Sequence, residues 1–595
     1  MPNLLDRLKE RKLGQWALAY LAGAFFVYTA LDPARETWDI PSAVVRMIHI
    51  LLIFGFFITL VLAWYHGERG RQRVSGPELL MVAALLVIAG VAVSLLGSDA
   101  DIPKPGIPDV RGAEDGRPVI LVLVCDNISP DPDDAYFAEG LHEAILHRLA
   151  QISGLASLGR ETAKWYRDNP VSPSEISTRE GLDFVGECSV RKDPTGGRIL
   201  VTFQLLDGGG VHVWSQEYDS DLTVANLFEI QGGIAQEVAD RIGVTLTPEE
   251  SVRMQAVPTG SLTAYDLYLL GRARWWSREP SALEESLGLY QAAIEEDPGF
   301  ALPYAGLAQT YLLLPSYSMF SEVDVHDLNR RAKEAARTAL ELDPTLSEAH
   351  SALAYIANLY DWDWADAERH FSLALLAEPD NAQALAWYSE VLTTLGRVDE
   401  AVEMASRAAE IDPHFYSTRI DLALALWNSG DGLAAEQELR AQMEALPGSP
   451  APYFWLAFLY RLSGRAGDLG ELQEEMSAAT AGPGQAADYG FGSLGVVWSI
   501  PDNPIERQEA LNTVRAFVPN TPRQSIMCLL WASLLAELGA IDEGIEVFQA
   551  MVAGRSPFVP FMNSRLIPPV YWEHPGFLAI LDEVGLPRPL DLTGD

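Results

Sequence analysis

Residues 382–415 read AQALAWYSEVLTTLGRVDEAVEMASRAAEIDPHF, and this stretch contains one complete unit of a repeating pattern. It holds two runs of apolar residues at helical spacing, which meet at Gly396. Its Pro-terminated ending recurs along the chain in EEDPGF, ELDPTL, AEPDN, EIDPHF and ALPGSP, whose prolines are Pro298, Pro344, Pro379, Pro413 and Pro447. A recurring unit of this kind predicts stacked pairs of antiparallel helices.

The last three spacings between these prolines fit the period of about 34 residues that is typical of the tetratricopeptide repeat. Short side chains recur twelve and five residues before the prolines, where paired helices must approach closely: Ser286 and Ala293, Ala332 and Ala339, Ala367 and Ala374, Ala401 and Ala408, then Ala435 and the longer Gln442. The first spacing is longer and predicts an insertion near residues 315–327. We expect about seven helix pairs over residues 248–560 and a closing cap over 561–595, because terminal repeats have to close the core.

The composition of the 595-residue chain excludes several classes of protein. Its 42 Lys and Arg stand against 82 Asp and Glu, a formal net charge of −40. Contact with nucleic-acid phosphates needs a basic surface, so we expect no nucleic-acid partner. Three cysteines are too few for a disulfide-rich scaffold or a cysteine-based zinc site.

Residues 1–97 differ from the rest, because they are slightly basic and hold three long apolar segments, 13–31, 44–64 and 79–96. Each approaches the ~20 apolar residues of a bilayer-crossing helix. The sequence therefore predicts three transmembrane helices in the lipid bilayer, with three buried helices of a soluble domain as the alternative. Basic residues precede the first segment and separate the second from the third. The positive-inside rule then places the N-terminus in the cytoplasm and residues from about 97 onward in the periplasm, across the inner membrane.

Residues 98–117 are rich in Pro, Gly and charge and predict a linker. Residues 118–247 predict a small α/β domain. Its strand patterns lie at 119–124, 155–158, 184–190, 199–206 and 212–218, and its helix patterns at 133–152, 174–180 and 227–242. The predicted fold class is an α plus α/β multidomain protein with three transmembrane helices, a small α/β domain and a helical-repeat solenoid.

The α/β domain contains, in order, VLVCDNISPDPDDAYFAEGLHEAILHRLAQISGLASLGR, FVGECSVRKD, RILVTFQLLDGGGVHVWSQEYD and LFEIQGGIAQEVADRI. These strings resemble the TolB-amino-terminal-like (FlgO-like) domain. That domain is frequently found ahead of tetratricopeptide repeats in bacterial proteins of the adenylate-cyclase-associated and transcriptional-regulator type. The resemblance implies a bacterial repeat protein, here with a membrane anchor predicted from residues 1–97, and brings no catalytic residue. Many relatives carry a cyclase or winged-helix domain in front, where this chain has apolar segments.

Cys125 and Cys188 depart from that family, which usually has an aromatic residue and a Gly at these positions. Both lie on predicted strands of one sheet. In an oxidising compartment they could form a disulfide. Two small buried thiols are the alternative.

No motif predicts catalysis, a cofactor or a metal site. His142 and His147 in HEAILH are five residues apart, so they do not share the helix face that a zincin motif needs. GFGSLG at 490–495 matches the dinucleotide fingerprint, but no predicted strand precedes it. The acidic and aromatic residues at 361–366 are expected to cap and pack a repeat helix. We therefore expect no enzyme, no cofactor and no metal.

The concave groove of the repeat array is the candidate site, because the first helices of such repeats line it. Its polar and aromatic positions suit an extended peptide or a partner helix, although an ordinary solvated face is the alternative. The predicted partner-binding residues are Gln309, Glu348, Tyr355, Asn358, Gln383, Glu390, Thr393 and Trp427.

The sequence thus predicts a non-enzymatic, inner-membrane-anchored scaffold or adaptor that binds protein partners through its periplasmic domains. Two alternatives stay open: a subunit or assembly factor of a large membrane complex, and a membrane sensor or regulatory subunit. The oligomeric state does not follow from the sequence.

Overall fold

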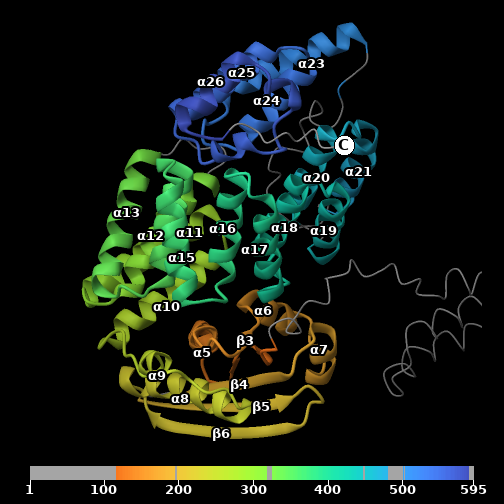
Figure 1. Cartoon of the computed structure of the whole chain (residues 1–595). Helices are drawn as coiled ribbons and strands as arrows, with labels where there is room; N and C mark the ends of the chain where they lie inside the picture. The colour runs from red at the N-terminus through yellow and green to blue at the C-terminus, as the bar shows by residue number, and fades with distance from the viewer. Residues whose placement is uncertain are drawn as a thin grey trace, which may run out of the picture. The chain divides into compact units, whose positions relative to one another are not determined.

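A computed structural model describes residues 116–193, 197–317, 324–446, 449–479, 500 and 503–587. The chain divides into two compact units, Met1–Asp109 and Val110–Asp595, and every described residue belongs to the second. Within this unit a small α/β domain, orange to yellow in Figure 1, is followed by a long series of helices, green to blue.

The α/β domain is built on a six-stranded mixed sheet. Its strands are β1 (Val119–Val122), β2 (Asp126–Asn127), β3 (Ala156–Ser157), β4 (Phe184–Lys192), β5 (Arg198–Asp207) and β6 (His212–Asp221). They lie in the order β3-β1-β4-β5-β6, with β2 paired to β4. Strand β1 is parallel to β3 and β4, whereas β4, β5 and β6 form an antiparallel meander.

Helices cover both faces of the sheet around β1. Ile120 and Val122 face the core shared with α5 (Ala135–Ala150) and α8 (Val224–Ile242). The alternate residues Val119 and Leu121 face α6 (Arg160–Asp168) and α7 (Pro173–Glu180). Burial on both faces explains why β1 reads as a continuous apolar run.

A disulfide joins Cys125, just after β1, to Cys188 on β4, with the Cα atoms 4.6 Å apart. These are the two cysteines for which the sequence left a disulfide and two thiols as alternatives. The third cysteine, Cys528, is a buried free thiol in the last helical part.

The solenoid consists of consecutive antiparallel helix pairs (Figure 1). After the short α9 (Pro248–Met254), the pairs are α10 (Leu262–Trp276) with α11 (Pro280–Glu296), α12 (Ala301–Tyr317) with α13 (Val325–Leu342), α14 (Ser347–Ile356) with α15 (Trp364–Ala377), α16 (Ala382–Thr394) with α17 (Val398–Ile411), α18 (Tyr416–Ser429) with α19 (Gly432–Ala445), and α20 (Pro450–Leu462) with α21 (Leu469–Ala479). A single π-helical turn, Ala357–Asp361, extends α14.

The small-residue columns explain how the pairs stack. The Ser and Ala residues twelve and five positions before the prolines are all fully buried, and Gln442 is 5 % exposed. Side chains of this size let helix backbones come close without leaving cavities. Gly396 and Gly430 take positive φ angles of 75° and 100° at the turns between paired helices, a conformation that favours glycine.

The C-terminal helices form a further packed region. It contains α23 (Pro504–Phe517), α24 (Met527–Glu537), α25 (Ile541–Ala553) and α26 (Pro575–Val584), with short 3-10 turns at Pro560–Asn563 (η5) and Pro569–Tyr571 (η6). Tyr571 is fully buried, and its hydroxyl donates to the carbonyl of Ala532 at 2.7 Å. This region shares one apolar core with α18 to α21.

The predicted fold class needs a correction in its first part. Throughout the described ranges, no helix is both long enough and apolar enough to cross a membrane. The described helices instead bury their apolar faces against one another. The three segments predicted to span a bilayer, 13–31, 44–64 and 79–96, lie outside the described residues. For the described part of the chain, the fold class is therefore a small α/β domain followed by a mostly helical solenoid, without three transmembrane helices.

Candidate functional site

The candidate site is a cavity where the α/β domain meets the solenoid. Helix α5 packs on α10, and Gly140 makes this close approach possible, because a Cβ at that position would lie 2.6 Å from Leu269. The cavity has a volume of about 300 Å³ and is lined by α5, α10, α12 and the turns that lead into α14 and α16. This volume lies at the small end of the range for small-molecule pockets.

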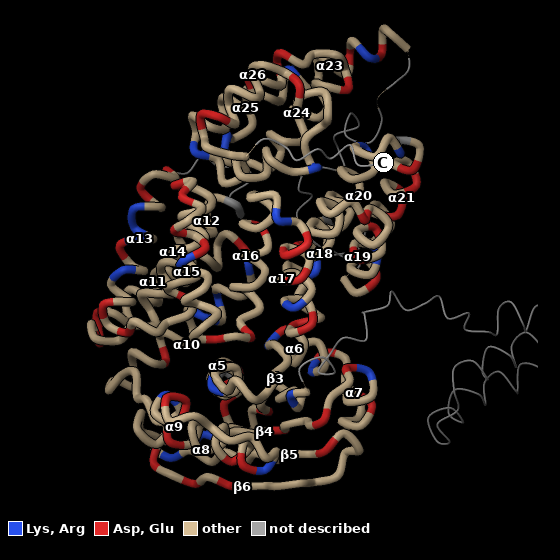
Figure 2. Tube along the Cα trace, in the orientation of Figure 1, with Lys and Arg blue, Asp and Glu red and all other residues tan. Residues whose placement is uncertain are grey.

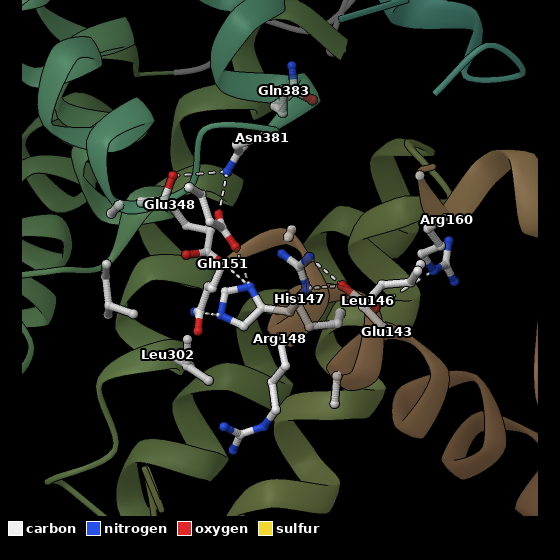
Figure 3. A pocket seen from close by; sticks show the side chains of 18 of the residues that line it. Glu143, Leu146, His147, Arg148, Gln151, Arg160, Leu302, Glu348, Asn381 and Gln383 are labelled. Carbon is white, nitrogen blue, oxygen red and sulfur yellow. Dashed lines mark hydrogen bonds and ion pairs between the residues drawn. The ribbon is translucent and has the colours of Figure 1, made fainter. Parts of the chain in front are cut away.

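His147 of α5 lies at the polar centre of this cavity. Its Nδ1 is 2.7 Å from Glu378 Oε1 and 3.9 Å from Glu348 Oε1. Its Nε2 lies 2.9 Å from Gln151 Nε2, and Asn381 donates to the second oxygen of Glu378 at 2.8 Å. Figure 3 shows Glu348, Gln151 and Asn381 gathered around the ring of His147.

The three ionisable groups of this centre influence one another. Burial alone would lower the pKa of His147, but the charge and hydrogen bond of Glu378 raise it to about 9. Burial would raise the pKa of Glu378, yet the partnership with His147 lowers it. The pKa of Glu348 is raised by burial and by the neighbouring Glu378. At neutral pH His147 is therefore cationic and paired most closely with Glu378, while Glu348 lies farther from the same cation, at 3.9 Å.

A second polar cluster surrounds Glu143, also on α5. Arg272 Nε donates to Glu143 at 2.8 Å, Arg272 Nη2 donates to the same oxygen, and Trp276 Nε1 donates at 3.0 Å. Arg160 Nε lies 3.7 Å from the other oxygen. Burial would raise the pKa of Glu143, but the two guanidinium groups and the indole hold it at about 2. Glu143 is thus a fully compensated anion that ties α5 to α10.

Several polar atoms that line the cavity lack a partner within the described structure. Glu348 Oε2, Gln309 Oε1 and Gln231 Oε1 are buried and accept no hydrogen bond. Gln309 is 4 % exposed and Gln231 is 1 % exposed. An unsatisfied buried acceptor costs about 1–3 kcal/mol, so these atoms are candidates for contact with a ligand.

The α/β domain is also held to the solenoid beside this cavity. Asp412, in the turn after α17, accepts from Thr162 N at 2.8 Å, from Thr162 Oγ1 at 2.7 Å and from Glu161 N at 3.1 Å. It therefore caps the first turn of α6. Asp380 accepts from Arg117 at 2.7 Å and from Arg407 at 2.9 Å.

The structure separates the predicted partner-binding residues into two groups. Gln309, Glu348 and Gln383 line the cavity described above. The other five lie outside it. Glu390 and Thr393 line a small second cavity, Tyr355 bonds to Glu390, and Asn358 and Trp427 line neither cavity.

The second group mixes buried and partly exposed side chains. The hydroxyl of Tyr355 lies within hydrogen-bond distance of both carboxylate oxygens of Glu390, at 2.8 and 2.9 Å. The Tyr355 ring stacks on the Trp387 ring, with the ring centroids 4.4 Å apart. Asn358 is fully buried, whereas Glu390, Thr393 and Trp427 are half-buried. Partner binding by these residues stays a prediction.

A segment of the chain itself lies along this part of the groove. Asn428 accepts from the backbone N–H of Arg565 at 2.8 Å, and Trp427 Nε1 donates to the carbonyl of Arg565 at 3.2 Å. Asn563 donates to the carbonyl of Thr394 at 2.9 Å. Pro560 and Phe561 share the second cavity with Glu390 and Thr393. Side chains of the groove thus bind main-chain atoms of an irregular segment.

Sequence reasoning named Glu348 as a groove residue but missed the other charged groups of the first cavity. The sequence presents His147 only as part of a zincin-like string, and nothing in it singles out Glu143, Arg272 or Glu378. The partners lie on helices and turns far apart along the chain, so no local pattern indicates the pairing. Among the described residues, no group of three or more His, Cys, Asp and Glu is arranged to hold a metal ion.

Comparisons with known proteins give one family match and several weaker likenesses. A relative from Rhizobium meliloti (strain 1021), named "Putative adenylate cyclase 3", is 28 % identical over 253 residues, which are 42 % of this chain and 41 % of that protein. The chain therefore matches less than half the length of that curated relative.

Solved structures also resemble parts of the chain. PilW, a type IV pilus biogenesis factor, is 16 % identical, with 38 % of this chain and 97 % of PilW covered at a TM-score of 0.30. The pilF protein of Pseudomonas aeruginosa is 16 % identical to this chain. The match covers 47 % of this chain and 96 % of pilF at a TM-score of 0.25. At these scores the likenesses carry no information on function.

The family match falls on the middle of the solenoid. Residues 361–426, from the end of the π-helical turn through most of α18, match the tetratricopeptide repeat. The helix pairs on either side continue the same stacking. This chain therefore contains a tetratricopeptide-repeat domain.

Proposed function

We propose that this protein is a non-enzymatic scaffold that binds protein partners through the inner face of its tetratricopeptide-repeat solenoid. The observation that carries the proposal is the stack of helix pairs, with its family match over residues 361–426. Tetratricopeptide domains generally bind peptides, and a solenoid offers an extended concave surface for them.

The segment around Arg565 supports this mode of binding. Trp427 and Asn428 contact the carbonyl and the N–H of one residue, as a groove does when it holds the main chain of an extended peptide. A partner peptide would use the same kind of contact at Gln383. At Thr393 it would compete with Pro560 and Phe561, which share the second cavity with that residue.

Affinity capture with a matched pair of variants tests the proposal. Thr393→Arg places a long cation in the groove, whereas Thr338→Arg makes the same change on α13, the second helix of its pair; both threonines are half-buried. We expect a protein captured by the wild-type chain to be lost with Thr393→Arg and retained with Thr338→Arg. Equal capture by both variants would contradict groove binding. Co-purification in fixed stoichiometry in mild detergent would favour a subunit of a larger complex over a scaffold.

We also propose that residues 118–247 are a TolB-amino-terminal-like domain. The order of strands and helices in the quoted strings supports this. The relative named as an adenylate cyclase does not lead us to propose that activity here, because the chain matches only 41 % of its length.

The disulfide supports a proposed location for the described residues. Disulfides form and persist in oxidising compartments, which for a bacterial protein means the periplasm. A reporter that is active only in the periplasm, fused after Leu592, should be active, and a cytoplasm-only reporter should be silent. The reverse pattern would contradict this location. Localisation at the inner membrane stays a prediction, which membrane fractionation tests.

A further inference from the structure

We propose that the cavity beside His147 binds a primary alkylammonium group, carried either by a free amine or by a lysine side chain. The cavity shares Gln309, Glu348 and Gln383 with the proposed groove, but the proposal does not rest on the scaffold function, because a free amine would bind here without a protein partner. It rests on unpartnered acceptors, on the distribution of charge and on the apolar walls of the cavity.

Three acceptors of the cavity have no hydrogen-bond donor within the described structure. Two donors of the same lining, Trp275 Nε1 and Arg253 Nε, also lack a partner there. Gln309 Oε1, Gln231 Oε1 and Glu348 Oε2 all line the cavity, are buried and accept no hydrogen bond within the described structure. An ammonium group has three N–H donors and no acceptor. It therefore supplies what these atoms lack, whereas an anion would place further acceptors beside them.

The charges around the cavity also favour a cation next to Glu348. Glu143 compensates Arg272 and lies beside Arg160, and Glu378 compensates His147. Glu348 is left 3.9 Å from the nearest cationic atom and close to the second carboxylate of Glu378. A bound ammonium ion would provide a further positive charge there.

Among the other cations of the lining, Arg148 belongs to another part of the wall. Arg148 donates to the carbonyls of Arg253, Met254 and Ala256 at 2.7 to 3.0 Å. Figure 3 shows its side chain directed away from Glu348. The carbonyl oxygens thus satisfy this guanidinium without drawing it toward Glu348.

The other walls suit an alkyl chain. The rings of Tyr268, Trp275 and Trp276 and the side chains of Leu302 and Leu346 line the same space. Methylene groups gain from burial against such walls. Guanidinium groups already lie over the rings of Trp275 and Trp276, so these rings serve as walls for the alkyl chain. A volume of about 300 Å³ accommodates a chain of five or six carbons with its amino group.

Titration calorimetry of the full chain with n-pentylamine tests the proposal, with n-pentanol as the neutral probe of equal length. We expect saturable binding of one n-pentylamine per chain and binding of n-pentanol at least tenfold weaker. Glu348→Gln removes the charge at constant shape and should weaken n-pentylamine binding at least tenfold. Glu341→Gln, on the exposed end of α13, is the matched control and should leave the affinity unchanged.

Gln309→Met provides a second variant with a separate readout. It removes an unsatisfied buried acceptor, so the thermal midpoint should stay the same or rise, while the affinity for n-pentylamine falls severalfold. A general loss of structure would lower both quantities. This variant keeps the proposal falsifiable if Glu348→Gln does not fold.

The two sources of the ammonium group are distinguished with a capped Gly-Lys-Gly peptide. Tighter binding of n-pentylamine supports a free amine as ligand, and tighter binding of the peptide supports a lysine of a partner protein. Binding of neither probe overturns the proposal. So does equal affinity for n-pentylamine and n-pentanol, or an unchanged affinity in Glu348→Gln.

Discussion

At the scale of single residues, His147 links the α/β domain to the solenoid through a charge. Its pKa of about 9 in the folded chain lies above the ordinary value of 6.5, so protonation stabilises the fold. The contribution is fully present below pH 6.5 and is lost as the pH rises through about 9. The side chain is 32 % exposed, which reduces the effect through solvent screening.

We predict that the free energy of unfolding of the wild-type chain falls by about 1–2 kcal/mol between pH 6.5 and pH 9.5. His147→Gln should remove most of this dependence, as measured by urea unfolding at several pH values. The matched control is His326→Gln, at an exposed position of α13, which should keep the wild-type profile. An unchanged profile in His147→Gln would show that the ion pair with Glu378 does not stabilise the fold.

At the scale of elements, α6 depends on a cap from a distant part of the chain. Gly159 at its N-terminus has no side chain, and Asp412, far along the chain, supplies the acceptors for the first turn. The Gly159 N–H also donates to the carbonyl of Ile411 at 2.6 Å. A Cβ on Gly159 would lie 2.4 Å from the carboxyl group of Asp412.

We predict that Gly159→Ala lowers the free energy of unfolding by about 1–3 kcal/mol, because the Asp412 cap must move away. Gly159 has φ −77°, so the backbone itself tolerates alanine. Gly260→Ala is the matched control, since no atom lies within 4 Å of its added Cβ. Equal unfolding midpoints for the two variants in urea would refute the cap.

Helix α6 is an example of an element that the local sequence does not predict. The repeat helices follow from local periodicity and from small residues at fixed spacings, and these residues are buried as the pattern requires. Helix α6 is absent from the sequence-based expectations, because residue 159 offers no local capping side chain. The pairing of His147 with Glu378 could not be predicted for a related reason. It joins two domains, and the sequence around each residue does not indicate its partner.

At the scale of the whole described unit, acidic residues are spread over the α/β domain and the solenoid helices alike (Figure 2). The sequence predicts an open groove on the solenoid. The structure instead places α5 at one part of the inner face and the segment around Arg565 at another. Local patterns indicate the groove, but they do not indicate which parts of the same chain contact it.

The segment around Arg565 gives a prediction at this scale. Asn428→Ala removes the acceptor for the Arg565 N–H, a hydrogen bond worth about 1 kcal/mol. Trypsin should therefore cleave after Arg565 about fivefold faster, because local opening becomes more frequent. Asn512→Ala on α23, an exposed position, is the control and should leave the rate unchanged. Equal rates in both variants would show that Asn428 does not hold this segment.

Protein partners are proposed to bind the inner face of the solenoid. The most direct measurement is photo-crosslinking in cells, with a photoreactive amino acid at position 383 on α16 or at position 403 on α17. We expect a specific crosslinked protein, identified by mass spectrometry, from position 383 and none from the exposed position of Glu403. Identical crosslinks from both positions, or a specific partner from position 403 alone, would contradict binding to the inner face.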